Sequence, residues 1–290
     1  MQSAIERDLH LFRRGHTLDD VAQTVHLVRS AGFENLNLDL IYGIPGQSPG
    51  DWKRTLEAAL ALDPNHISAY GLQVEGGTTL KKWIMQGKVP PPDDDLAADM
   101  YNLAEEMLEA AGFVHYEISN WARRQLSVNS KQLSVSTDDC SLMTDHCSLT
   151  TDNWPLASRH NLLYWRNEPY LGFGCGAHSW FGRRRFSKVR HPRAYVDAIE
   201  AGQGAEAESE RISRELEMSE TMMLGLRLLE EGVRRDQFAS RFDADMYDVY
   251  SDNIERLARM GLVEVDTHRL RLSRRGRLVG NRVFGEFLTS

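Results

Sequence analysis

The sequence predicts an α/β protein that combines part of a TIM-like barrel with a small, mainly helical domain at its carboxyl end. Helical and strand patterns alternate between residues 4 and 118, which is typical of right-handed parallel β-α-β units. Between Leu36 and Tyr42, apolar residues occur at both odd-numbered and even-numbered positions, as expected for a strand covered on both faces. After Tyr195 the pattern becomes mostly helical and ends in an alternating segment.

Residues 1–124 are assigned to the partial barrel. Gly32 stands where a glycine ends a helix, and Asp63-Pro64 stops a later one. The apolar spacing predicts helices at residues 4–14, 18–31, 50–62 and 94–111. Strands are predicted at residues 36–42, 66–72 and 114–118.

Residues 125–154 interrupt this alternation with a seven-residue repeat. Units such as His146-Cys-Ser-Leu-Thr-Thr-Asp152 place Ser, Thr and Asp where a coiled coil needs helix formers. We therefore expect an insertion in a surface loop, and a flexible one. Cys140 and Cys147 recur at one place in successive units, so duplication explains their spacing better than a zinc site does.

Residues 155–202 are assigned to the rest of the core and 203–290 to the carboxyl-terminal domain. A helix is expected at 193–202, and Gly202 with the acidic run after it has the composition of a linker. The last domain resembles a winged helix because three helices precede a hairpin. Its helices are predicted at 211–231, 234–242 and 246–260, its hairpin at 262–272 and a final helix after Ser273.

The composition is that of an ordinary globular protein, with 41% hydrophobic and 26% charged residues among 290. The formal net charge of −8 disfavours nucleic acid as a partner. No apolar run is long enough for a membrane span, which leaves peripheral membrane contact open. The chain lacks a recognisable secretion signal and a paired cysteine pattern, so we expect a cytoplasmic protein.

Several short motifs occur in an order that carries a family resemblance. They are Arg14-Gly-His-Thr17, Asn37 to Gly46, His66-Ile-Ser68, Glu75-Gly-Gly-Thr78, His115-Tyr-Glu-Ile-Ser-Asn120, Arg159-His-Asn161 and Tyr170 to Ser179. Together they resemble the HemW and oxygen-independent coproporphyrinogen oxidase branch of the radical-SAM superfamily. The resemblance implies a partial radical-SAM barrel that lacks its first strands. The motif His160-Asn-Leu-Leu-Tyr-Trp165 favours the HemW side, which is understood as a group of haem chaperones.

The resemblance implies that Gln2, Arg14, Asp39, Ile41 and Gln73 bind S-adenosylmethionine. A carboxylate at a strand end of a parallel barrel can hold two ribose hydroxyls, and Asp39 is placed for this role. Otherwise Asp39 is a structural residue that bonds to the following turn. Gln2 and Arg14 match polar contacts to the cofactor, although Arg14 also suits a plain surface position. Ile41 and Gln73 match the adenine lining, where core packing is nearly as good an explanation.

The 4Fe-4S cluster of the family is held by three cysteines spaced C-x3-C-x2-C. The resemblance places this motif well before the position that matches Gln2, and Cys140, Cys147 and Cys175 cannot supply it. We therefore expect a chain that is truncated at its amino end, or whose start codon is assigned too late. We also expect no metal ligands in this chain and no reductive cleavage of S-adenosylmethionine by it alone, and we leave its enzymatic activity open.

Haem requires an axial ligand and apolar surface for the macrocycle. The resemblance implies that His160, Asn161, Tyr164 and Trp165 contact haem, with the imidazole of His160 as the ligand. The alternative is that Tyr164 and Trp165 are core aromatic residues and that His160 bonds to a backbone carbonyl. His178 is a second candidate imidazole.

Three functions compete at this point. The first is a HemW-like chaperone with haem as its ligand and an unknown haem acceptor. The second is an oxidoreductase of the coproporphyrinogen III oxidase type in porphyrin biosynthesis, which needs the upstream cysteines. The third is a winged-helix DNA-binding regulator, suggested by a local basic face and disfavoured by the acidic total. That face comprises Arg271, Arg274, Arg275, Arg277 and Arg282.

Overall fold

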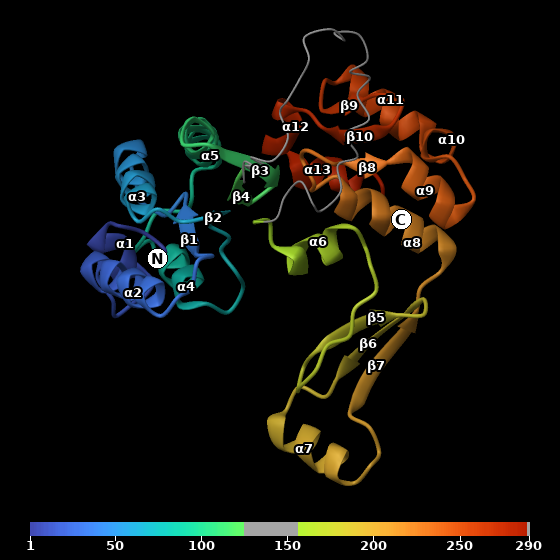
Figure 1. The fold of residues 1–290 in the computed structure, drawn as a ribbon, viewed down its shortest axis with the longest axis horizontal. Helices are drawn as coiled ribbons and strands as arrows, with labels where there is room; N and C mark the ends of the chain where they lie inside the picture. The colour runs from blue at the N-terminus through green and yellow to red at the C-terminus, as the bar shows by residue number, and fades with distance from the viewer. Residues whose placement is uncertain (125–155, 289–290) are drawn as a thin grey trace, which may run out of the picture. The chain divides into compact units, whose positions relative to one another are not determined.

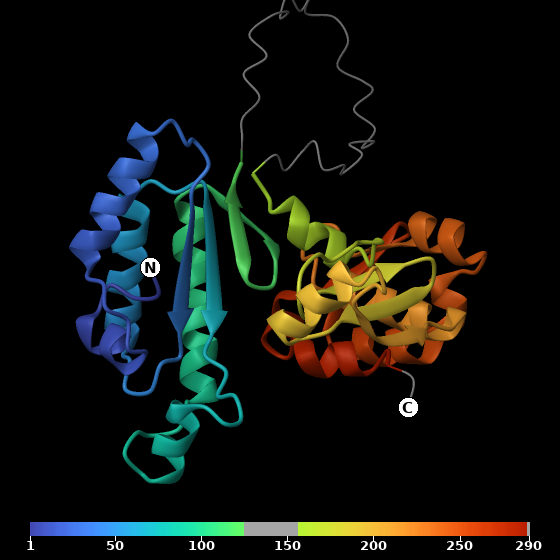
Figure 2. The same ribbon diagram turned by 90° about the horizontal axis from the view of Figure 1, so that it is seen from below.

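The structure is a computed structural model that describes residues 1–124 and 156–288. The chain divides into two compact units, Met1–Ala157 and Ser158–Ser290, which Figures 1 and 2 show from two sides. Residues 158–202, which the sequence analysis grouped with the barrel core, lie in the second unit. The predicted insertion at 125–154 lies outside the described residues. None of the described helices has the length and hydropathy that crossing a bilayer requires.

The first unit is a four-stranded sheet with helices packed on one face (Figure 1). The strands β1 (Asn37–Tyr42), β2 (His66–Gly71), β3 (Phe113–Glu117) and β4 (Asn120–Arg123) lie in the order β1-β2-β4-β3. The helices are α1 (Glu6–Leu11), α2 (Leu18–Ser30), α3 (Pro49–Ala61), α4 (Thr79–Met85) and α5 (Asp94–Ala110).

The two faces of β1 differ in burial. Leu38 and Leu40 are buried in the core, together with Trp52 of α3 and Met100 of α5. The residues that alternate with Leu38 and Leu40 at the start of the strand are exposed. The expectation of a strand covered on both faces is therefore wrong for the described residues. Apolar residues occur on both faces of the strand only near its end, where Ile41 lies on the same face as Asp39 and is half-buried, as is its neighbour.

The sheet is mixed, not purely parallel. β1 and β2 are parallel, as predicted, with Asn37 opposite His66. β3 was predicted, but β4 lies between it and β2 and is antiparallel to both. β4 was missed because four residues carry too little alternation to reveal a strand, and the short helix α4 was missed as well. Within residues 1–124 the sheet stays open, with β1 and β3 at its edges.

Local sequence signals explain the helix starts in this unit. Thr17 and Ser48 each accept a hydrogen bond from the backbone N–H three residues later, and an aspartate at that position completes a capping box. Pro49 then occupies the first turn of α3, where its missing N–H costs nothing. α1 ends earlier than predicted because Arg13 has a left-handed φ of 53°.

The second unit contains two antiparallel sheets and eight helices among its described residues. One sheet has the order β5-β6-β7, with β5 (His178–Phe181), β6 (Arg184–Lys188) and β7 (Glu206–Arg211). The other has the order β8-β10-β9, with β8 (Val233–Arg234), β9 (Val263–Val265) and β10 (Arg269–Leu272). The helices are α6 (Arg159–Trp165), α7 (Pro192–Glu200), α8 (Arg214–Gly225), α9 (Arg235–Phe242), α10 (Met246–Val249), α11 (Ser251–Arg259), α12 (Arg274–Leu278) and α13 (Gly280–Gly285).

The carboxyl-terminal part has helices in the expected regions, followed by the hairpin β9–β10, but the helix expected at 246–260 is divided at Tyr250 into α10 and α11. Two other details of the prediction were also wrong. The segment after Gly202 that resembled a linker contains β7, which pairs with β6 although all of its residues are exposed. The helix expected at 211–231 is α8 alone, because Ser213 caps its start and the hydrogen bonds after Gly225 change to the three-residue turns formed by Arg227 and Leu228.

Candidate functional site

A series of hydrogen-bonded polar side chains crosses one face of the β1–β2 pair, which is exposed at β1 and buried at β2. Asn37 donates from Nδ2 to Oδ1 of Asp39 at 2.8 Å and to the hydroxyl of Ser68 at 3.2 Å. Nδ1 of His66 lies 2.7 Å from Oδ1 of Asn37. Nε2 of His66 lies 2.8 Å from the hydroxyl of Tyr116 on β3. This series of hydrogen bonds therefore links β3, β2 and β1 and ends at the carboxylate of Asp39.

The burial of these groups falls toward Asp39. His66 and Tyr116 are buried, whereas Asp39 is exposed. Burial lowers the pKa of His66 to about 4, although the negative charge of Asp39 acts in the opposite direction. The imidazole is therefore neutral near pH 7, so one ring nitrogen donates and the other accepts. The second oxygen of the Asp39 carboxylate, Oδ2, has no hydrogen-bond donor among the described residues and is open to a ligand.

The amino-terminal segment lies along the outer edge of β1. The N–H of Ile41 donates to the carbonyl oxygen of Gln2 at 2.8 Å, and Oε1 of Gln2 is buried without a partner among the described residues. Burial lowers the pKa of the Met1 amino group, an effect that Asp39 opposes and Arg14 reinforces. Gln2, Asp39 and Ile41, three of the five residues expected to bind S-adenosylmethionine, therefore lie together at this edge. Arg14 is exposed in the segment that follows α1.

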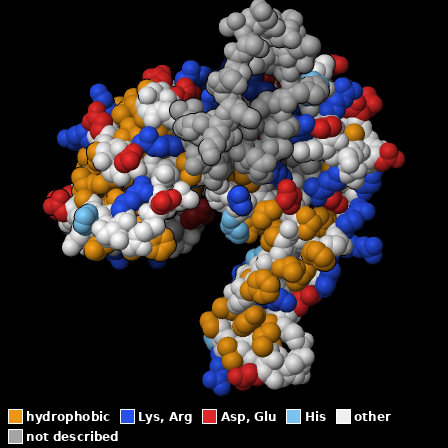
Figure 3. Space-filling view, in the orientation of Figure 1, with side chains coloured by type: hydrophobic (Ala, Val, Ile, Leu, Met, Phe, Trp, Pro, Cys, Tyr) orange, Lys and Arg blue, Asp and Glu red, His pale blue; other side chains and the backbone are white. Residues whose placement is uncertain are grey.

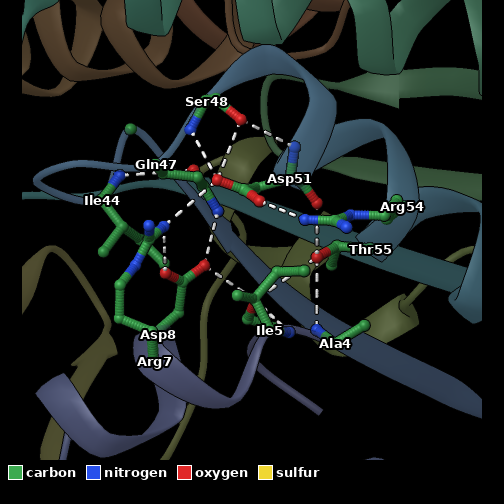
Figure 4. Close-up of polar contacts among 12 residues, drawn as sticks. Ala4, Ile5, Arg7, Asp8, Ile44, Gln47, Ser48, Asp51, Arg54 and Thr55 are labelled. Atoms are coloured by element: carbon green, nitrogen blue, oxygen red, sulfur yellow. Dashed lines mark hydrogen bonds and ion pairs between the residues drawn. The ribbon is translucent and has the colours of Figure 1, made fainter.

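A buried polar cluster fixes the position of this segment (Figure 4). The carboxylate of Asp8 accepts hydrogen bonds from the hydroxyl of Ser3 at 2.9 Å and from Nε2 of Gln47 at 3.1 Å. The hydroxyl of Thr55 accepts from the N–H of Ala4 at 3.2 Å. Residues 2–4 are thereby held to α1, to α3 and to the turn after β1.

Gln73, the fifth predicted residue, is exposed just beyond β2. Because β1 and β2 are parallel, Gln73 lies at the same end of the strands as the turn that follows β1. Its exposure does not agree with core packing. A cavity of about 300 Å³ lies beside α2 and β1, but none of the five predicted residues lines it.

The second unit carries the predicted haem motif on α6, which Ser158 caps by accepting from the N–H of Asn161. The rings of His160 and Tyr164, one turn apart, meet edge to face at 4.9 Å, and Tyr164 meets Tyr170 in the same way at 4.6 Å. His160 is exposed, and its ring nitrogens form no hydrogen bond with a described residue. The imidazole is therefore available to a ligand.

Trp165 lies in a different environment from His160. The guanidinium of Arg227 lies over its indole ring at 4.3 Å and 5.5 Å from the ring of Phe284 on α13. The indole also lines a cavity of about 60 Å³ with residues of α8 and α9. This geometry agrees with packing of Trp165 in the helical domain, and it separates Trp165 from the exposed His160 and the half-buried Tyr164.

Exposed apolar side chains gather on the β5–β7 sheet and α7 (Figure 3). Phe173 is 87% exposed in the glycine-rich loop before β5, and His178 is exposed at the start of that strand. The other members are Leu171, Phe181, Val196 and Ile199. Such surface is what an apolar macrocycle would need beside an imidazole. In the described ranges, no group of three or more His, Cys, Asp or Glu side chains is arranged to hold a metal ion.

His66, Asn37 and Tyr116 were not predicted from the sequence as members of the site. The signal was present in the two parallel strands, because Asn37 and Asp39 are two residues apart, as are His66 and Ser68. Polar residues at that spacing share one face of a strand, so two such pairs on neighbouring strands indicate one polar surface.

Three comparisons with known proteins were informative. Residues 212–279 match the family model described as the HemN C-terminal domain. The chain is 32% identical over 275 residues to the haem chaperone HemW of Bacillus subtilis, covering 95% of this chain and 64% of that protein. It is 36% identical over 222 residues to HemW of Synechocystis, and this match covers 76% of this chain and 47% of that protein. The mitochondrial radical S-adenosyl methionine domain-containing protein 1 of Bos taurus is 30% identical to the chain, and this match covers 95% of this chain and 58% of that protein.

A solved structure of coproporphyrinogen III oxidase (HemN) from Escherichia coli, described as a radical SAM enzyme, has the same fold. The TM-score is 0.72 at 19% identity, and the match covers 99% of this chain and 62% of that one. The chain thus spans less than two thirds of the length of these relatives. From its sequence relatives, its carboxyl-terminal domain and its fold, the chain belongs to the HemW-like branch of the radical-SAM family.

Proposed function

We propose that the protein to which this chain belongs is a haem chaperone that binds haem through His160 and S-adenosylmethionine on its first unit. The observation that carries this proposal is the exposed imidazole of His160, packed against Tyr164 and without a hydrogen-bond partner among the described residues. An axial ligand must be accessible and held in one orientation, and this arrangement supplies a side chain of that kind.

In the cofactor site, Oδ2 of Asp39 would accept hydrogen bonds from the ribose hydroxyls. Gln2 would contribute its buried Oε1, which has no hydrogen-bond partner in the part of the chain that the structure describes, and Arg14 would bind the carboxylate end of the cofactor. Ile41 and Gln73 would border the adenine. In this family S-adenosylmethionine, bound with a 4Fe-4S cluster, supplies the redox chemistry. The residues of this chain bind and orient the cofactor.

For haem, Tyr164 would support the macrocycle beside His160, and Asn161 would lie at its margin. Because Arg227 lies over Trp165, that indole would act through the position of α6 and not as a direct contact. A cytoplasmic location and a separate haem-accepting protein are parts of this proposal that follow from the family.

The test is to titrate the chain with haem and to monitor the Soret absorption of the complex. His160→Ala should abolish or shift the Soret band of the complex, because the axial nitrogen is lost. His191→Ala is the matched control, since His191 is exposed in the same unit and outside the motif. Identical spectra for the two variants would refute the assignment. If the Soret band is lost only in His178→Ala, the axial ligand is His178 on β5 and not His160.

A coproporphyrinogen oxidase activity is a second candidate, favoured by the HemN C-terminal domain and by the shared fold. Tighter binding of the porphyrinogen than of haem would support it. The DNA-binding alternative is weaker because Arg271 is already paired with Glu264 at 2.8 Å in the hairpin. A salt-dependent shift of duplex DNA by the protein would support the DNA-binding alternative, and the absence of a shift at low salt would refute it.

A further inference from the structure

The carboxylate of Asp39 is held by a directed series of hydrogen bonds that begins inside the sheet. Asn37 and His66 are opposite each other in the β1–β2 register, and Asp39 follows Asn37 on the same face. Their three contacts with one another and with Tyr116 are between 2.7 and 2.8 Å. Each lies within the ordinary range for a hydrogen bond.

The direction of every bond in this series can be assigned from Asp39 inward. An ionised carboxylate only accepts, so the amide group of Asn37 that faces Asp39 must be Nδ2. Oδ1 of Asn37 then faces His66 and accepts, which places the imidazole proton on Nδ1. Nε2 of the neutral ring is left as an acceptor, and the hydroxyl of Tyr116 donates to it. All three donors therefore point toward Asp39.

We propose that Asn37, His66 and Tyr116 are positioning residues that fix the Asp39 carboxylate for the ribose hydroxyls of a bound nucleoside. This inference rests on the proposed S-adenosylmethionine site and goes beyond it, because it assigns a role to three residues that do not touch the cofactor. Asn37 occupies Oδ1 of Asp39 and orients the carboxylate so that Oδ2 is presented to the ligand. His66 and Tyr116 hold Asn37, and their burial makes that arrangement stiff.

A first test needs no ligand. In nitrogen-15 spectra of the full chain, the proton of the His66 ring should be on Nδ1 near pH 7. A proton on Nε2 would reverse the direction of the series and overturn the proposal.

The second test is calorimetric binding of S-adenosylhomocysteine and of its counterpart lacking both ribose hydroxyls. Asn37→Ala should weaken binding of the first roughly tenfold, as loss of a supporting hydrogen bond does at other sites. It should leave binding of the second unchanged, because the effect passes only through the hydroxyls. Asn35→Ala is the matched control, since Asn35 is exposed just before β1.

The outcomes separate this inference from the site on which it rests. If Asp39→Ala weakens binding but Asn37→Ala does not, the positioning role is wrong and the ribose site stands. If Asn37→Ala weakens both ligands equally, the effect is structural and the proposal fails. If neither Asp39→Ala nor the loss of the hydroxyls changes binding, or if the unaltered chain binds no S-adenosylhomocysteine, the cofactor site itself is refuted.

Discussion

The stability of the first unit should depend on pH through His66. Burial lowers the pKa of this imidazole to about 4 in the folded protein, against 6.5 for an unperturbed histidine. Between these values the unfolded chain binds a proton that the folded chain does not. Protons therefore favour unfolding, and the free energy of unfolding falls as the pH is lowered from 6.5 to 4. Above pH 6.5 the contribution of His66 is complete.

The magnitude follows from the two pKa values. Each pH unit in that interval corresponds to about 1.4 kcal/mol, so the full loss is about 3 kcal/mol. About 2 kcal/mol of this should already be lost at pH 5. For a domain whose total stability is of order 10 kcal/mol, this is a large fraction.

The assay is amide hydrogen exchange at Leu38 and Ile67, which are buried on β1 and β2 and report opening of this unit. Wild type and His66→Gln are compared at several pH values, because the difference between them removes the contribution of carboxylates that titrate in the same range. The advantage of wild type should shrink by about 3 kcal/mol between pH 7 and 4. His10→Gln, at an exposed site in the same unit, should follow wild type. Parallel pH profiles for wild type and His66→Gln would refute the reasoning.

Other predictions concern packing and capping. Gly276→Ala should destabilise the second unit by about 2 kcal/mol or more in urea unfolding, because the new Cβ would lie 1.9 Å from the carbonyl oxygen of Leu262. Gly285→Ala, where nothing lies within 4 Å, should instead be neutral or stabilising by up to about 1 kcal/mol, and equal effects would contradict the steric argument. Thr17→Ala should lower the stability of the first unit by about 1 kcal/mol, and Thr17→Ser should restore it. Leu56→Ala should cost about 2 to 5 kcal/mol because this side chain is fully buried, and a loss below 1 kcal/mol would show that the core collapses around the gap.

Much of the first unit could be predicted because its signals are local. The ends of α2 and α3 were visible in Gly32 and Asp63-Pro64, and the parallel strands in their short, mainly apolar segments. β4 and β7 could not be predicted, since β4 is short and β7 has the composition of a loop. β4 pairs with the distant β2 as well as with the neighbouring β3, and β7 pairs with β6 across the intervening α7, so only the assembled sheet supplies all the hydrogen bonds that make them strands.

The candidate site was predictable only where a residue type and its place in a motif were sufficient. Asp39 and His160 could be singled out as a carboxylate and an imidazole. The partners that orient Asp39 depend on the register of β1 with β2 and on the position of Tyr116, which no local pattern specifies. Conversely, Trp165 belongs to the motif of His160, yet the fold packs it against Arg227. Neighbours in a motif need not share an environment, because successive residues of a helix point in different directions.

The two candidate sites differ in how firmly the chain holds them, and this difference agrees with the functions proposed for them. Asp39 is on a strand of a sheet and ends a series of hydrogen bonds that starts from buried groups. Such support favours tight binding, because little freedom is lost when the ligand arrives. His160 is exposed on a seven-residue helix and is oriented mainly by its contact with Tyr164. In the haem chaperone proposed above, an accessible ligand with few supports could be exchanged for one on the acceptor. We therefore expect the proposed cofactor site to retain its ligand and the proposed haem site to transfer it.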